Sequence, residues 1–271
     1  MTDFGELLAA YDANTRARIP DPAPSGVEYE WDGALLRTIG QHRGFVETPR
    51  DPGVRGAALD ALIARQRDYF AARGQAVEWK TRGHDLPDDL IDRLTAAGFE
   101  PEERETVLIG EAAALAAEPA PPPPGVTLRQ VTEYEDLRRI AAMHTEVWNE
   151  DRSYLADHLA RSIATAAGGF LVFAAEAQTP TGPQVVCAAW LTLREGTGFA
   201  GFWGGSTLAR WRRRGVYRAL VARRAQVAAA HGVKYVQVDA SENSRPILRR
   251  LGLHAVTTTT PYVWTPLPNA R

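Results

Sequence analysis

The residues most able to do chemistry lie in a short basic turn in the second half of the chain. Arg212, Arg213, Arg214 and Gly215 follow a glycine-rich strand and precede a helix that we expect to begin at Val216. A glycine here can take a positive φ and leave the N–H groups of the turn unshielded. Free N–H groups at a helix N-terminus, the helix dipole and nearby arginines together favour a phosphate or pyrophosphate. We therefore predict that this turn binds an anionic cofactor.

Two simpler interpretations of the basic turn stay open. Seven arginines lie between Arg210 and Arg224, and a run of charge is often just a solvated surface. The same run could contact nucleic acid, in which case binding would be steeply salt-dependent. The whole chain has a net charge of −2 and a pI near 6.3, so it is no polycation. We therefore expect no nucleic-acid partner.

The composition is that of an ordinary globular protein. The chain has 271 residues, of which 45% are hydrophobic, which is enough for two domains with buried cores. The single cysteine, Cys187, excludes an internal disulfide and a cysteine-based metal cluster, and we expect no metal. We find no apolar run of 18 residues and no secretory signal at the N-terminus. We expect a cytoplasmic protein without a membrane partner.

The elements that must position the basic turn follow from the hydrophobic pattern of residues 125–264. Strands are expected over 126–131, 170–175, 185–193, 199–208, 233–238 and 255–264, and helices over 133–148, 154–166, 216–230 and 245–251. The turn therefore joins a strand to a helix, and another strand follows that helix.

An Ala- and Pro-rich segment, residues 111–124, divides the chain. It ends in four consecutive prolines, which favour an extended polyproline conformation, and we interpret it as a stiff linker between domains 1–110 and 125–271. The first domain repeats the helix–strand–helix order that follows the basic turn, over 55–73, 76–80 and 86–96. Chance similarity of two such segments is the alternative. Only 54 residues precede this part of the first domain, against 89 in the second, so we expect a shortened, degenerate copy.

The second domain resembles the GNAT (GCN5-related) N-acetyltransferase superfamily. Arg212, Gly215 and Tyr217 fall on the acyl-CoA signature Arg/Gln-x-x-Gly-x-Gly/Ala, with tyrosine in the last position. Residues 244–253 are similar to the Ser-x-Pro-Ile-Leu-x-x-Leu-Gly-Phe form of the last helix of the family. The resemblance covers about 140 residues, 125–264. It implies an α+β fold with a mixed, mostly antiparallel central sheet flanked by helices, here in two GNAT-like halves.

The resemblance also implies the reaction. Acetyl-CoA, or another acyl-CoA, would donate its acyl group to the primary amine of a small molecule by direct attack, without a covalent enzyme intermediate. The fourth strand would bulge at Gly204 and Gly205, and a backbone N–H near Thr207 or Leu208 would polarise the thioester. The implied cofactor-binding residues are Thr207, Leu208, Arg212, Arg213, Arg214, Gly215, Val216, Tyr217 and Asn243.

The sequence does not single out the residues that would transfer protons. The candidates for the general base are carboxylates at the ends of the first helix and the fifth strand of this domain, Glu146, Glu150, Asp151 and Asp239. Each could equally be a surface or capping residue, and His144 is expected in the core. Leu248 occupies the position of the family's acid tyrosine, so Tyr217 is the leading acid, with Ser241 and Asn243 as alternatives. We take Tyr217, Asp239 and Glu146 as the catalytic candidates.

The first domain is not expected to bind acyl-CoA. Its counterpart of the basic turn, residues 50–55, contains Asp51, which brings negative charge, and Pro52, which lacks an N–H. We expect this domain to pack on the catalytic one, giving either a monomer that is an internal pseudo-dimer or a homodimer. The alternative to an enzyme is a catalytically silent acyl-CoA-binding or regulatory module.

Overall fold

The computed structural model describes residues 4–21, 23–118, 120–180 and 182–266. Its elements, in chain order, are α1 (Phe4–Thr15), β1 (Glu28–Asp32), β2 (Leu35–Ile39), β3 (Gly44–Glu47), α2 (Gly56–Ala71), β4 (Val77–Arg82), α3 (Leu90–Ala96), β5 (Glu100–Pro101), β6 (Glu105–Glu111), α4 (Ala112–Ala117), β7 (Val126–Val131), α5 (Tyr134–Trp148), α6 (Leu155–Thr165), β8 (Phe170–Thr179), β9 (Gly182–Arg194), β10 (Phe199–Thr207), the 3₁₀ turn η1 (Ala209–Trp211), α7 (Val216–Ala230), β11 (Tyr235–Ala240), α8 (Arg245–Arg250) and β12 (His254–Trp264). None of the described helices is long and apolar enough to cross a membrane.

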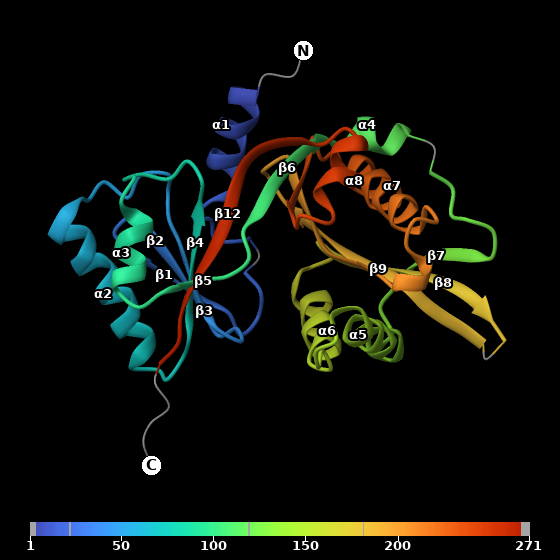
Figure 1. Cartoon of the computed structure of the whole chain (residues 1–271), viewed down its shortest axis with the longest axis horizontal. Helices are drawn as coiled ribbons and strands as arrows, with labels where there is room; N and C mark the ends of the chain where they lie inside the picture. The colour runs from blue at the N-terminus through green and yellow to red at the C-terminus, as the bar shows by residue number, and fades with distance from the viewer. Residues whose placement is uncertain (1–3, 22, 119, 181, 267–271) are drawn as a thin grey trace.

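A single 12-stranded sheet runs through both halves of the molecule. Its order is β1-β2-β3-β4-β12-β6-β11-β10-β9-β8-β7, with the short β5 paired to β12 (Figure 1). The pairs β3–β4 and β10–β11 are parallel, and the other pairs are antiparallel. The expected mixed, mostly antiparallel sheet flanked by helices is confirmed.

Two strands in the middle of the sheet are exchanged between the halves. Strand β6 belongs to the first half in sequence, yet it pairs with β11 of the second half along nearly all of its length, from Tyr235↔Glu111 to Ala240↔Thr106. Strand β12 ends the second half in sequence and pairs with β4 of the first, from Thr259↔Arg82 to Trp264↔Val77. Figure 1 shows both strands bridging the two halves. The halves therefore share one sheet.

The predicted linker is only partly a linker. Its Ala-rich part, Ala112–Ala117, is the helix α4, and Ala112 and Leu115 are buried in the core of the second half. Alanine has the highest intrinsic helix propensity, and an apolar surface beside α7 was available to this segment, so the extended interpretation was wrong here. The prolines at 121–124, in contrast, form neither helix nor strand.

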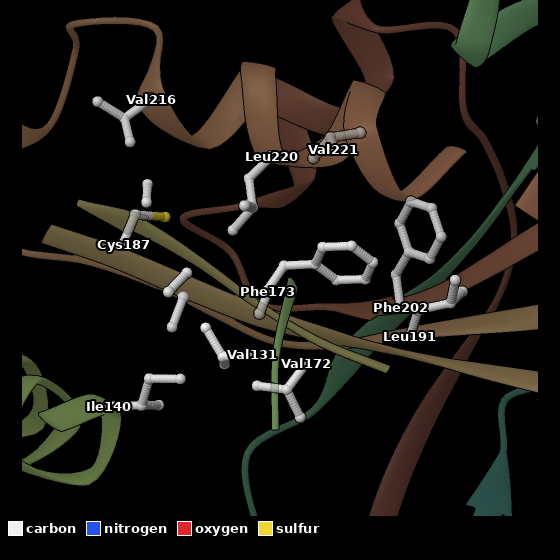
Figure 2. Packing of buried hydrophobic residues seen from close by; sticks show 14 of the residues in the cluster. Val131, Ile140, Val172, Phe173, Cys187, Leu191, Phe202, Val216, Leu220 and Val221 are labelled. Carbon is white, nitrogen blue, oxygen red and sulfur yellow. The ribbon is translucent and has the colours of Figure 1, made fainter. Parts of the chain in front are cut away.

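The second half has helices on both faces of its sheet. Figure 2 shows Val216, Leu220 and Val221 on the α7 side and Ile140 on the α5 side of the strands. Helix α7 has the predicted bounds, because Gly215 with φ +85° opens it and Gly232 with φ +73° follows its end. The other elements expected in this half are also present.

The first half has a smaller core of its own, between α2, α3 and strands β1–β4. Phe70, Trp79 and Phe99 are fully buried in it. The expected order helix–strand–helix is found as α2, β4 and α3, whereas α1 and β1–β3 were not anticipated. Helix α1 instead covers the middle of the sheet, where Leu7 and Tyr11 contact strands of both halves.

Candidate functional site

The basic turn leads into a helix whose N-terminus has no capping side chain among the described residues. Gly215 and Arg213 both take positive φ values, +85° and +63°. The side chain of Val216 is buried under α7, so only its backbone can face a ligand. The turn thus presents backbone N–H groups at the positive end of the helix dipole, as an anion site requires.

The three arginines of the turn are exposed and available. Arg212 donates from Nε to the carbonyl of Thr207 at 3.1 Å, and the guanidinium of Arg214 lies 4.9 Å from the ring centre of Trp211. In the described part of the chain, Arg212, Arg213 and Arg214 form no ion pair with a carboxylate. Their charge is therefore not neutralised by the protein.

Strands β10 and β11 separate on the side of the sheet next to this turn. They pair from Phe199↔Tyr235 to Gly201↔Gln237, and no described pair follows. Between Trp203 and Ser206, β10 bulges away from its register with β9, which confirms the predicted bulge. The part of β10 after Gly201 is therefore paired with β9 but not with β11, and we call this unpaired side of β10 the opening between the two strands.

The glycines of the bulge are required by what lies against them. Gly204 has φ +62°, and a methyl group there would overlap the ring of Trp190. A methyl group on Gly205 would lie 2.7 Å from the ring of Tyr217. Neither position can take a side chain without moving an aromatic ring, so the bulge depends on both glycines.

The backbone narrows the predicted oxyanion donor to one residue. The N–H of Leu208 already donates to the carbonyl of Val186 at 3.0 Å and is not available. Because N–H groups alternate sides along a strand, the N–H of Thr207 is directed away from β9, toward the opening. Its hydroxyl donates to the Cys187 sulfur at 3.1 Å, and burial raises the pKa of that thiol to about 11.

Tyr217 lies in the first turn of α7, against Gly205, and its phenol neighbours the guanidinium of Arg224. Burial raises the pKa of Tyr217, so the phenol keeps its proton at neutral pH and can donate it. Arg224 is only 1% exposed and donates to the carbonyl of Trp190 at 3.2 Å.

The carboxylates near the end of α5 are engaged in local contacts. Glu146 forms an ion pair of 2.5 Å with Arg210, Glu150 one of 2.8 Å with Arg152, and Asp151 accepts the N–H of Ser153 at 2.9 Å. These three carboxylates therefore have the surface and capping roles that the sequence offered as the alternative to a general base.

His144 and Asn243 lie in different surroundings. His144 is buried beside Trp190, as expected, and burial lowers its pKa to about 4. Asn243 is exposed in the turn after β11.

Asp239 is tied to the first half of the molecule. Its side chain is 3% exposed, and Oδ2 lies 2.6 Å from Nζ of Lys80 on β4. Burial alone would raise the pKa of Asp239, but the Lys80 ammonium outweighs burial and holds the pKa below its usual value of 3.8. Such a carboxylate takes up a proton poorly at neutral pH, which weakens its candidacy as the base.

Two residues near Asp239 were not anticipated. Glu105 begins β6, and burial together with the Asp239 charge raises its pKa to about 7. Arg194, at the end of β9, donates to Oε1 of Gln237 at 2.9 Å.

Two cations of this region lie beside one aromatic ring. Lys80 Nζ and the Arg194 guanidinium lie 5.9 Å and 5.8 Å from the ring centre of Trp203, where the bulge begins. We call Lys80, Glu105, Arg194, Trp203 and Asp239 the central polar cluster. Its members come from five strands, so no local pattern could have revealed it.

The central polar cluster lies on the α1/α5 side of the sheet. Val236 and Val238 face the core under α7, and side chains alternate along a strand, so Asp239 faces the opposite side. The basic turn and the cluster are therefore reached from different sides of the same opening. Among the described residues, no group of three or more His, Cys, Asp or Glu side chains is arranged to hold a metal ion.

Comparison with known proteins gives the fold. No family model matches the sequence, and no curated protein matches it either. A GCN5-related N-acetyltransferase from Kribbella flavida matches with a TM-score of 0.67 and 19% identity, over 100% of this chain and 98% of that one. A tandem GNAT protein from the clavulanic acid biosynthesis pathway matches with a TM-score of 0.64 and 16% identity, over 98% and 95%. A GCN5-related N-acetyltransferase from Sphaerobacter thermophilus has a TM-score of 0.61 and 16% identity, over 88% and 82%.

Proposed function

We propose that this chain, which has the fold of the GCN5-related N-acetyltransferases along its whole length, transfers an acyl group from acetyl-CoA to a primary amine. One observation carries the proposal: the part of β10 that is free of β11 begins beside the central polar cluster, at Trp203, and ends at the unneutralised basic turn. That combination offers anion binding at one end and proton transfer at the other. No metal takes part in the proposed reaction.

The backbone of β10 and α7 would hold the co-substrate. N–H groups of Gly215, Val216 and Tyr217, with the three arginines, suit a pyrophosphate. The bulged strand leaves backbone groups of β10 free of β11, and an extended pantetheine arm can pair with them. The N–H of Thr207 would stabilise the oxyanion, a contribution of roughly 3 kcal/mol to the barrier.

Residues on opposite faces of the sheet would carry out the two proton transfers, one from the amine and one to the leaving thiolate. We assign the general base to Glu105, because a pKa of about 7 lets it accept the amine proton, directly or through water, at neutral pH. The nitrogen then attacks the thioester carbonyl carbon, and the carbon–sulfur bond breaks. Tyr217, on the other face beside Gly205, would donate its proton to the leaving thiolate. Asp239 would act electrostatically in this scheme, because its charge raises the pKa of Glu105, whereas Glu146 stays in its surface ion pair with Arg210.

A silent acyl-CoA-binding module is the second candidate. The observation in its favour is that Asp239 and Glu146 are both held in ion pairs, while Leu248 is buried at the position of the family's tyrosine. Such a module would bind acetyl-CoA and release no CoA with any amine.

Calorimetric titration with acetyl-CoA tests the cofactor site. We expect one site per chain, because the corresponding turn of the first half uses its own groups internally: Asp51 accepts from the N–H of Gly53 at 2.8 Å and pairs with Arg55 at 2.7 Å. Replacing Arg212 or Arg214 by alanine should weaken binding by about fivefold to tenfold, the effect of one charge-assisted contact.

Arg223→Ala serves as the matched control, since this exposed arginine lies further along α7, away from the turn. Two sites per chain, or equal affinities in all variants, would contradict the assignment of the turn. CoA release in the presence of an amine panel then separates the enzyme from the silent module.

A further inference from the structure

A large cleft separates the two halves of the molecule on the same side of the sheet as the central polar cluster. Its volume is about 1450 Å³, and it lies between α6 and the β9–β10 turn of the second half and the loops after α1 and β2 of the first. Arg194 belongs both to the lining of this cleft and to the central polar cluster. A molecule in the cleft can therefore extend from the loops of the first half toward the opening between β10 and β11.

The cleft has an excess of unpaired positive charge. Arg18, Arg161 and Arg194 line it together with two carboxylates, Asp21 and Glu195. In the part of the chain that the structure describes, none of the three arginines lies within ion-pair distance of a carboxylate. A ligand with negative charge would therefore meet cations that the protein itself leaves uncompensated.

Arg194 carries most weight among the three, because its surroundings are the least hydrated. Burial lowers the pKa of its guanidinium more than the charges of Asp239 and Glu47 raise it, and among the described residues its side chain donates to the neutral amide of Gln237, at 2.9 Å, with no carboxylate at ion-pair distance. The nearest acidic group on that strand, Asp239, is already bound to Lys80 at 2.6 Å. Withdrawing a cation from water without a charged partner is unfavourable, and a bound anion would remove that penalty. The planar guanidinium fork matches a carboxylate or a phosphate.

We propose that this cleft is the acceptor site, and that the acceptor is an amine that also carries a carboxylate or phosphate bound by Arg194. The proposal rests on the proposed acyltransferase function. The charges of the site fit such an acceptor: Arg194 would bind the anionic group, and Glu105, in the same central polar cluster, would attract the cationic amine. The amine would then lie at the central polar cluster, beside the part of β10 that is free of β11.

Paired amines that differ in one anionic group test the acceptor class. Suitable pairs are lysine and cadaverine, ornithine and putrescine, and phosphoethanolamine and ethanolamine, with CoA release as the readout. For at least one pair the anionic member should have a kcat/KM at least about tenfold higher, the effect of one bidentate charge-assisted contact. Equal values within every pair would overturn the proposal.

Arg194→Met should lower kcat/KM of the preferred anionic amine about tenfold or more, mainly through KM, and should change kcat/KM of the partner amine that lacks the anionic group by less than about twofold. Arg194→Lys should restore part of the loss, and Arg223→Met, outside the cleft, should have no effect. The affinity for acetyl-CoA, measured in the same samples, should stay unchanged. A loss that is equal for both members of a pair would mean that Arg194 is merely structural.

A direct titration separates this proposal from the proposed function. The same anionic amines are titrated into the protein, with and without acetyl-CoA, and heat is recorded for the unmodified chain and for Arg194→Met. Binding that depends on Arg194 but produces no CoA would support the cleft and refute the enzyme. If the anionic amines do not bind and are not preferred as substrates, while acetyl-CoA still binds, the cleft is not the acceptor site. The assignment of the cofactor site would be unaffected by that result.

Discussion

Replacing Glu105 by glutamine should raise the unfolding free energy at high pH and, if Glu105 is the general base, lower the activity. Its pKa is raised from 4.5 to about 7 in the folded protein, mainly because burial disfavours the charged carboxylate. The folded state therefore holds this proton more tightly than the unfolded state does. The stability that Glu105 contributes is complete below pH 4.5 and is lost as the pH rises through about 7.

The magnitude follows from the size of the shift. A difference of about 2.5 pKa units corresponds to about 3.4 kcal/mol, and partial exposure of the side chain reduces this to about 2–3 kcal/mol. Most of that loss falls between pH 5.0 and 8.5. Glu105→Gln keeps the shape of the side chain and removes the titration. Relative to the unmodified chain, this variant should gain about 2 kcal/mol in unfolding free energy between those two pH values.

Urea denaturation at pH 5.0 and 8.5, followed by tryptophan fluorescence, measures this difference directly. Glu100→Gln is the matched control, because Glu100 is exposed and has no ion pair in the described structure, so its effect should be the same at both pH values. If Glu105 is the base, Glu105→Gln should also lose the limb of the pH–kcat/KM profile near pH 7. An effect of Glu105→Gln on unfolding free energy that does not change with pH would refute the reasoning.

Three further substitutions test other parts of the site. Lys80→Met should cost about 3–5 kcal/mol of unfolding free energy, because it leaves Asp239 buried without its cation, and adding Asp239→Asn should recover part of this loss in a urea double-mutant cycle. Gly204→Ala should lower the unfolding free energy by about 1–3 kcal/mol and weaken acetyl-CoA binding in calorimetry, because φ is +62° and the methyl group would overlap Trp190. Tyr217→Phe should lower kcat about tenfold to hundredfold and change the acetyl-CoA Kd little, since it removes a proton donor and no backbone contact. An unchanged kcat would remove Tyr217 from the acid role.

The sequence predicted those elements whose ends are marked by residues close to them in the chain. Helix α7 begins after Gly215 and ends before Gly232, and both glycines take the positive φ that such ends require. The bulge at Gly204 was predictable for the same reason, since a glycine inside a strand often marks a bulge or the close approach of another group. The short strands β1–β3 were not predicted, although Glu28–Asp32 alternates charged and aromatic residues as a strand does.

The exchange of strands could not be predicted, because pairing partners leave no mark within a strand. Strand β6 would look the same beside β4 or beside β11. The surroundings of Glu105 could not be predicted for that reason: its raised pKa depends on burial and on the charge of Asp239, which the sheet brings close from a distant part of the chain. The linker helix α4 was missed because its burial depends on α7, which also lies far along the sequence.

The exchanged strand β12 imposes an order on biosynthesis. The edge of β4 is covered only by residues that the ribosome makes after every other element of the second half. The first half therefore leaves the exit tunnel with an open strand edge, and it cannot be completed while translation of the second half continues. Until β12 has been made, the open edge of β4 can pair with a strand of another nascent chain on the same polysome. Protection by a chaperone would therefore matter more here than for a protein with two independent domains.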